Sequence, residues 1–164
     1  MRNRKLLHQI KNKWAWLPIM LLAACQSNTA YHSYQSIPLT GWAKSDTIVY
    51  ALPASIPAGE YEVEIGIRYQ ECYPYRDIWL GISQNMQDTL VYTTDTLQLF
   101  LADEEGNKIG NGPGGLYQCS LPYKTAFKIK QEGNTRSFRI VQIMKDDALK
   151  GISDIGIQIQ KPAK

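Results

Sequence analysis

The amino-acid sequence predicts an all-β protein: an antiparallel β-sandwich, jelly-roll-like, of about eight strands. Two observations support this prediction. Apolar and polar residues alternate with a period of two in several segments, and turn-forming residues such as proline, glycine and asparagine separate these segments. No long segment shows the period of about 3.6 residues that is typical of an amphipathic helix.

The segment at residues 60–69 has the clearest strand pattern. Five apolar residues alternate there with polar ones: Tyr61, Val63, Ile65, Ile67 and Tyr69. Such alternation predicts a strand with one buried face and one face in water. Shorter apolar segments predict further strands at residues 47–52, 78–82, 97–101, 127–129, 138–144 and 155–159.

A targeting segment precedes these strands. The first thirteen residues carry five basic side chains and no acid, and the next eleven, residues 14–24, are uncharged. This uncharged run is shorter than the about 20 residues that cross a bilayer, and it fits the apolar region of a signal peptide. It ends in Leu22-Ala23-Ala24-Cys25, which resembles the lipobox of bacterial lipoproteins. The sequence therefore predicts a lipoprotein signal peptide at residues 1–24 and a lipid on Cys25, with a plain secretory signal or a buried core helix as alternatives.

Two parts are expected after the signal peptide. Residues 25–45 are predicted to form the lipidated N-terminus and a tether, and residues 46–164 the β-sandwich domain. Acyl chains anchor a protein to a bilayer without spanning it. The residue directly after Cys25 is Gln26, not the aspartate that would signal retention in the inner membrane. The first acidic residue is Asp46, so the acidic run that would signal export to the cell surface is missing as well. We expect a lipid anchor in the outer membrane, with the domain facing the periplasm.

The charge of the mature chain argues against a nucleic-acid partner. Cleavage after residue 24 would remove five of the 18 basic residues and none of the 15 acidic ones. The remaining 13 basic and 15 acidic residues give a net charge of −2, whereas nucleic-acid binding needs a basic surface.

Two cysteines, Cys72 and Cys119, remain besides Cys25. In an oxidising periplasm they could form a disulfide, which requires Cα atoms within about 7 Å of each other. The alternative is two separate thiols, since free cysteine packs like a small apolar residue. No CxxC spacing is present, so a structural zinc site is not expected.

Candidate catalytic residues are few. His32 is the only histidine outside the signal peptide, and a Ser-His-Asp or Cys-His site would need it to dock from the tether onto the domain. Asp146 and Asp147 are adjacent, so in a strand their carboxylates would point to opposite faces. We expect a protein that is not an enzyme and that uses no cofactor or metal.

Aromatic residues form the most distinctive cluster. Tyr73, Tyr75 and Trp79 lie close together in the sequence, and Trp79 is out of phase with the apolar residues of its strand. Trp79 should therefore face away from the core, where an indole can contact a partner protein or stack on a sugar ring, unless the strand is covered on both faces. Arg68, on the polar side of the longest predicted strand, completes this candidate ligand or partner surface, with an ion pair to Asp77 or to a glutamate of its own strand.

Several short segments follow one another in a distinctive order: Trp42, Tyr73-Pro74-Tyr75, Asp95-Thr96-Leu97, Leu101-Ala102-Asp103, Gly110-Asn111-Gly112 and Gly151-Ile152. This series resembles the gliding motility lipoprotein GldH family over roughly residues 42–160, and the lipobox agrees with it. The resemblance implies an outer-membrane lipoprotein linked to gliding motility and its secretion apparatus, without established catalytic activity. We therefore expect a structural or accessory component that contacts other envelope proteins; a carbohydrate-binding lipoprotein module is the alternative.

Overall fold

The computed structural model describes residues 28–86, 90–129 and 136–162, and these residues form ten strands and no helix. The strands are β1 (Thr29–Ser36), β2 (Trp42–Ala43), β3 (Ile48–Ala51), β4 (Gly59–Gln70), β5 (Asp77–Gln84), β6 (Thr93–Phe100), β7 (Leu116–Ile129), β8 (Ser137–Gln142), β9 (Ala148–Leu149) and β10 (Ile152–Gln160). Across the described ranges, no helix is long and apolar enough to span a bilayer. The predicted signal peptide and Cys25 lie outside the described residues.

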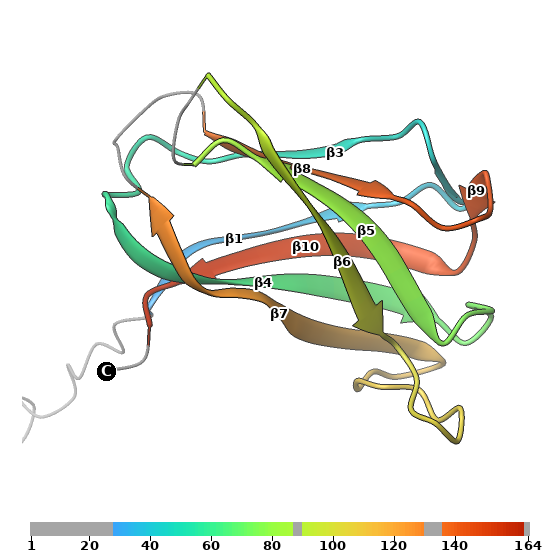
Figure 1. The fold of residues 1–164 in the computed structure, drawn as a ribbon. Helices are drawn as coiled ribbons and strands as arrows, with labels where there is room; N and C mark the ends of the chain where they lie inside the picture. Colours follow the sequence, from blue (N-terminus) through green and yellow to red (C-terminus); the bar gives the residue numbers. More distant parts are fainter. Residues whose placement is uncertain (1–27, 87–89, 130–135, 163–164) are drawn as a thin grey trace, which may run out of the picture.

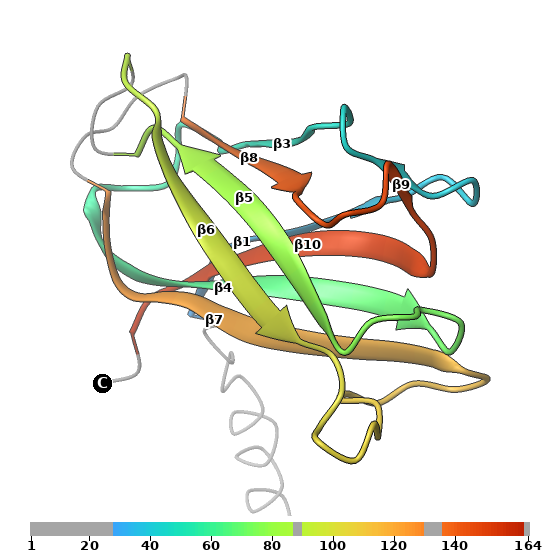
Figure 2. The same cartoon turned by 45° about the vertical axis from the view of Figure 1, so that its right-hand side comes forward.

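The eight longer strands form two four-stranded antiparallel sheets that lie face to face (Figure 1, Figure 2). The first sheet has the order β1-β10-β4-β7 and the second β3-β8-β5-β6, while β2 and β9 pair separately. If the eight longer strands are renumbered 1 to 8 along the chain, the two sheets have the orders 1-8-3-6 and 2-7-4-5. Strands that follow each other in the chain therefore lie in opposite sheets, except for the hairpin of β5 and β6. This is the arrangement of a jelly roll, and it confirms the predicted fold class.

The core lies between the two sheets and follows the predicted alternation. The five apolar residues expected to face inward on β4 are all buried: Tyr61, Val63, Ile65, Ile67 and Tyr69. The inward residues of β5 and β10 are fully buried as well: Ile78, Leu80, Ile82, Ile155, Ile157 and Ile159. Burial of each large apolar side chain contributes about 1.5–3 kcal/mol, so a one-residue shift of any of these strands would expose its whole apolar set.

The first strand differs from the prediction. The sequence predicts a tether over residues 25–45, but Thr29–Ser36 forms β1, which pairs with β10 at the edge of the first sheet. The ring of Tyr34 lies over two glycines of that sheet: a Cβ on Gly66 would come within 2.1 Å of the Tyr34 hydroxyl oxygen, and one on Gly156 within 2.7 Å of the ring. Backbone pairing and this ring attach β1, which is why the strand needs no apolar alternation. The folded domain therefore starts at β1 and not after the expected tether.

The strand β7 is also longer than expected. The sequence indicates a strand only at residues 127–129, whereas β7 runs over Leu116–Ile129 and pairs with β4 along its length. Most of its side chains are exposed or only partly buried, because β7 is the other edge strand of the first sheet. An edge strand also accommodates Pro122, which lacks an N–H for a neighbouring strand.

The carboxylate of Asp95 links β6 to β7 across one open edge of the sandwich. It accepts hydrogen bonds from Lys124 Nζ, 2.8 Å away, and from the Tyr123 hydroxyl. These two donors, Lys124 first, favour the charged carboxylate and lower the pKa of Asp95 below its ordinary value of 3.8.

We expect Asp95→Asn to lower the free energy of unfolding at pH 7 by about 0.5–1 kcal/mol, a small value because solvent screens this partly exposed group. A carboxylate whose pKa is lower in the folded state stabilises the fold above its unfolded pKa, and that contribution is lost as the pH falls through the folded pKa. Urea unfolding of both proteins should therefore give free energies of unfolding that converge as the pH falls below 3.8, the ordinary pKa of this carboxyl group. Asp147→Asn, which removes an exposed ion pair with Lys44, is the matched control and should change little. A difference between Asp95→Asn and wild type that stays undiminished in acid would contradict the assignment.

The two ends of the described chain meet at one end of the sandwich. Lys161 N donates a hydrogen bond to Asn28 O at 2.9 Å, so the start of β1 lies beside the end of β10, at the left of Figure 1. We call this the terminal end. The opposite end, built from residues 37–47, 71–76, 101–115 and 143–151, is called the far end.

Candidate functional site

Trp79 lies on the outer face of the second sheet, as predicted. Its neighbours on β5, Ile78 and Leu80, are fully buried, whereas Trp79 is 39% exposed. The indole Nε1 donates a hydrogen bond to Asp77 Oδ2 at 3.0 Å, and Gln98 Nε2 donates to the same oxygen at 2.6 Å. The orientation of the indole is therefore set by its own strand and by the neighbouring β6.

The two tyrosines of the predicted surface do not join Trp79. Tyr73 is 2% exposed, donates a hydrogen bond to Asp77 O at 2.8 Å, and packs edge-on against Tyr69 and Tyr75. Burial raises the pKa of the Tyr73 hydroxyl. Tyr75 is half-buried, and its hydroxyl donates to the carboxylate of Asp146 at 2.9 Å. The prediction that Tyr73 belongs to a ligand surface is wrong, because the turn after β4 folds this ring over the end of the core.

Arg68 lies on the other side of the molecule. Its Nε donates a hydrogen bond to Gln118 Oε1 at 2.8 Å, and its guanidinium stacks over the Tyr34 ring, 4.2 Å from the ring centre. The predicted ion pair with Asp77 or with a glutamate of β4 is absent from the described contacts. Because β4 and β5 belong to different sheets, Arg68 and Trp79 lie on opposite outer faces.

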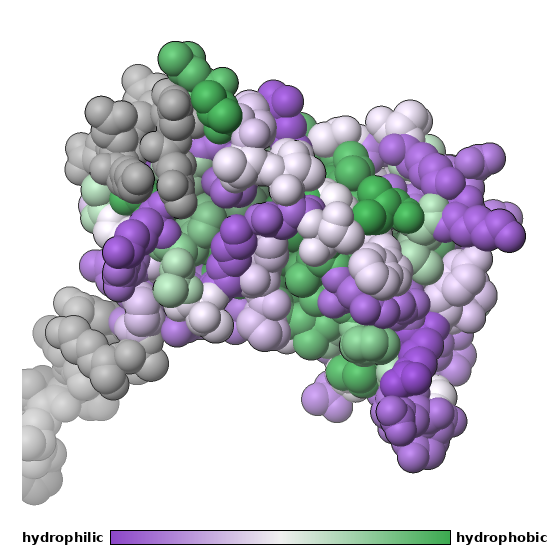
Figure 3. Space-filling view, viewed as in Figure 1, coloured by the Kyte–Doolittle hydropathy of each residue, from purple (hydrophilic) through white to green (hydrophobic). Residues whose placement is uncertain are grey.

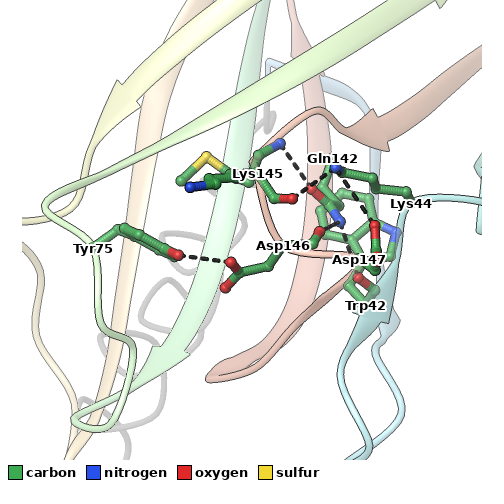
Figure 4. Close-up of polar contacts among 8 residues, drawn as sticks. Trp42, Lys44, Tyr75, Gln142, Lys145, Asp146 and Asp147 are labelled. Atoms are coloured by element: carbon green, nitrogen blue, oxygen red, sulfur yellow. Dashed lines mark hydrogen bonds and ion pairs between the residues drawn. The ribbon is translucent and has the colours of Figure 1, made fainter.

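A buried glutamine organises the far end (Figure 4). Gln142, 1% exposed, ends β8, and its Nε2 donates hydrogen bonds to the carbonyl oxygens of Trp42, at 3.3 Å, and of Asp146, at 3.0 Å. Its Oε1 accepts a hydrogen bond from Met144 N at 2.8 Å. The sequence analysis missed this residue; the available signal was a glutamine inside the apolar run 138–144.

The two adjacent aspartates of the far end have different partners. Asp146 receives the Tyr75 hydroxyl, and Asp147 Oδ1 lies 3.7 Å from Lys44 Nζ at the surface (Figure 4). They do not form an acid–base pair. Within residues 28–86, 90–129 and 136–162, no group of three or more His, Cys, Asp or Glu side chains is arranged to hold a metal ion.

The two cysteines of the domain are free thiols, so the disulfide weighed as one alternative is not formed. Cys119 is buried on β7 opposite Ile67, whereas Cys72 is exposed beyond the end of β4, in a shallow groove with Glu71 and Gly115. Burial raises the pKa of the Cys119 thiol to about 11, so this thiol stays protonated at neutral pH.

Three residues of the outer face of the second sheet were not singled out from the sequence. Phe100 on β6 and Ile143 after β8 are each 45% exposed, and Arg139 on β8 is exposed too. They come from strands that are distant in sequence, and only the order β3-β8-β5-β6 places them on one face with Trp79. The alternation of apolar and polar residues within one strand could not show that these residues share a face.

A family model described as GldH lipoprotein matches residues 29–159 of this chain. The match begins at the first residue of β1 and ends within β10, so it includes both sheets of the sandwich. It also includes β1, the strand that the sequence analysis had assigned to a tether.

Two curated proteins are similar over most of the chain. The gliding motility lipoprotein GldH of Flavobacterium johnsoniae is 25% identical over 149 residues, which cover 88% of this chain and 92% of that protein. A gliding motility lipoprotein GldH homolog of Christiangramia forsetii is 27% identical over 150 residues, covering 87% of this chain and 90% of that protein. Among solved structures, Eiger TNF from S. frugiperda gives a TM-score of 0.35 at 12% identity over 81% of this chain and 94% of that chain, which is too low to support any inference.

Proposed function

Because this chain belongs to the GldH lipoprotein family, we propose that it is a lipid-anchored, non-enzymatic component of the envelope machinery for gliding motility and its associated secretion. The observation that carries the proposal is the family match over residues 29–159, which takes in the whole jelly roll rather than one motif. Two relatives of nearly the same length are named as gliding motility lipoproteins or homologues of them.

The proposed anchor is a lipid on Cys25 in the outer membrane. Three residues separate Cys25 from the start of β1, so their Cα atoms are four steps apart and, at about 3.5 Å per step, lie no more than about 14 Å from each other. The terminal end of the sandwich would therefore stay close to the bilayer. The absence of an aspartate after Cys25 supports the outer membrane, with the domain on its periplasmic side.

The non-enzymatic role is supported by the places of the polar residues. His32, the only histidine after residue 24, lies exposed on β1 with its ring edge-on to Tyr34, 5.5 Å between ring centres. Asp146 and Asp147 are engaged by Tyr75 and Lys44. These contacts do not pair a nucleophile with a base.

Deletion of the gene tests the proposed role. We expect the deletion strain to lose colony spreading on agar and to accumulate secretion substrates in the cell, and a plasmid copy to restore both. Wild-type spreading and wild-type secretion in the deletion strain would refute a role in this machinery.

We expect Cys25→Ser to release the protein from membranes, because acylation supplies about 0.8 kcal/mol per buried methylene group and serine offers no thiol to acylate. Cell fractionation and mass spectrometry of the N-terminal peptide measure the result. Cys72→Ser is the matched control, since it removes an exposed free thiol at the far end, and it should stay membrane-bound. An unmodified thiol at Cys25 of the wild-type protein would contradict the anchor.

A further inference from the structure

The two outer faces of the sandwich differ in character. Seven large hydrophobic side chains are exposed among the described residues, and four of them lie on the second sheet: Val49, Trp79, Phe100 and Ile143, each 39–46% exposed. The other three lie in loops, and the outer face of the first sheet carries glutamate, glutamine and Arg68 instead. In the space-filling view, apolar patches lie over the end of β8 and the end of β6 (Figure 3). An antiparallel sheet that faces only water would be polar on this side, as the first sheet is.

We define the second-sheet face as the outer surface around six outward residues: Val49, Trp79, Phe100, Arg139, Val141 and Ile143. The same surface also carries the polar side chains of Ser83, Thr94, Thr96 and Gln98. A glycine lets the apolar members of this face pack closely. A Cβ on Gly81 of β5 would come within 3.1 Å of Val141 Cγ2 and 3.5 Å of Ile143 Cγ2. The side chains of Val141 and Ile143 therefore lie over the backbone of Gly81, on the strand that also carries Trp79. Side chains ordered before binding lose less entropy in a complex.

The second-sheet face also carries a cation, Arg139. The Arg139 guanidinium lies over the Tyr92 ring, 4.2 Å from its centre, and none of the described residues forms an ion pair with it. The N–H groups at the rim of this flat guanidinium can donate to a carboxylate from outside. Tryptophan, phenylalanine and arginine are enriched where proteins contact one another.

We propose that the second-sheet face is the docking surface for another envelope protein, one that offers apolar side chains around a carboxylate for Arg139. This inference rests on the proposed function and names the surface through which it acts. Branched aliphatic Val49 and Ile143 beside the aromatic rings favour a protein over a glycan, and one oxygen of Asp77 is already engaged by Trp79 and Gln98.

The size of the face predicts a dissociable contact. The four strands have four, six, eight and eight residues, and at about 3.3 Å per residue and about 4.8 Å between strands they cover roughly 400 Å². A stable interface of standard size takes about 800 Å² from each partner. The docked protein should therefore bind reversibly rather than form a permanent complex.

A photo-crosslinking amino acid at Phe100 of the full-length lipidated chain, in living cells, tests the surface directly. The matched control position is Ser120, exposed on the outer face of the first sheet. We expect one discrete protein adduct from position 100, identified by mass spectrometry, and none of that size from position 120. Equal adducts from both positions, or adducts only to lipid or to glycan, would overturn the proposal.

A triple variant, Trp79→Ser with Phe100→Ser and Ile143→Ser, tests whether the contact matters. The triple variant is combined with a photo-crosslinking amino acid at Thr96, which is exposed on the same face. The control is Leu39→Ser, which removes a 94% exposed side chain from a far-end loop. We expect the triple variant to lower the adduct yield about tenfold or more and to impair spreading and secretion, with Leu39→Ser unchanged. Thermal unfolding of the purified variants checks that both fold. If the gene deletion has its phenotype but the folded triple variant behaves as wild type, the second-sheet face is wrong and the proposed function stands.

Discussion

Gly151→Ala should destabilise the protein by about 3 kcal/mol, the sum of a backbone strain of about 1–2 kcal/mol and an overpacking cost of about 1–3 kcal/mol. Gly151 has a φ of +87°, which residues with a Cβ rarely adopt. Its added Cβ would lie 2.7 Å from Tyr73 Cα and 2.9 Å from Tyr73 N. These are backbone atoms, and Gly151 O itself accepts a hydrogen bond from Gln70 N at 2.8 Å, so neither segment can yield easily.

Gly106→Ala separates the two contributions. Gly106 has the same φ of +87°, but nothing lies within 4 Å of its added Cβ. We expect this control to cost only the strain, about 1–2 kcal/mol. Urea unfolding of the two variants and the wild type, at one pH, measures the difference. Equal losses for the two alanines would show that Gly151 is not packed against Tyr73 as described.

A second large loss, about 3 kcal/mol, is expected for Gln142→Met. Methionine has nearly the same volume, so little cavity forms, but three backbone groups lose their partner: Trp42 O, Asp146 O and Met144 N. Each buried polar group left without a hydrogen bond costs about 1–3 kcal/mol, reduced where water can enter. Hydrogen exchange of two backbone amides should become faster as well: that of Met144, which loses its acceptor, and that of Leu149, which pairs with Trp42.

Gln158→Met is the matched control. Gln158 lies on the outer face of the first sheet, and its side-chain Nε2 donates a hydrogen bond to Gln160 Oε1 on the same strand, at 3.0 Å. The same substitution there should change the free energy of unfolding by no more than about 0.5 kcal/mol. A similarly small change for Gln142→Met would refute the role of the buried amide.

The same arrangement ends a second strand. Gln84 closes β5 with 3% exposure, its Oε1 accepts from Met86 N at 2.9 Å, and its Nε2 donates to Thr93 Oγ1 at 2.5 Å. In both strands a buried glutamine binds the backbone two residues later. In both cases the glutamine takes the last inward position of its strand, at the point where the chain leaves the sheet.

Alternation predicted the strands that have one buried and one wet face. β4 and β10 show this pattern in full, and their limits lie within a few residues of the expected ones. The two edge strands of the first sheet were not predicted in full, because β1 and most of β7 are attached by backbone pairing that leaves no periodic pattern in the sequence. Residues 29–36 were therefore assigned to a tether although they complete the first sheet.

The candidate surface was predictable only within one strand. The phase of Trp79 against Ile78 and Leu80 places it outside correctly. The burial of Tyr73 depends on how the turn after β4 closes over the core, which phase does not describe. The separation of Arg68 from Trp79 depends on which sheet each strand joins, and only the strand order decides that.

The place of β1 has a mechanical consequence. If Cys25 carries the lipid, the connection to the membrane runs through three residues into a strand that is paired with β10 from Thr29 to Ser36. A pull on the lipid along this strand would load the row of β1–β10 hydrogen bonds together, and the Tyr34 ring over Gly66 and Gly156 would resist slippage. Drag between membrane and domain would then reach the body of the sandwich through this strand.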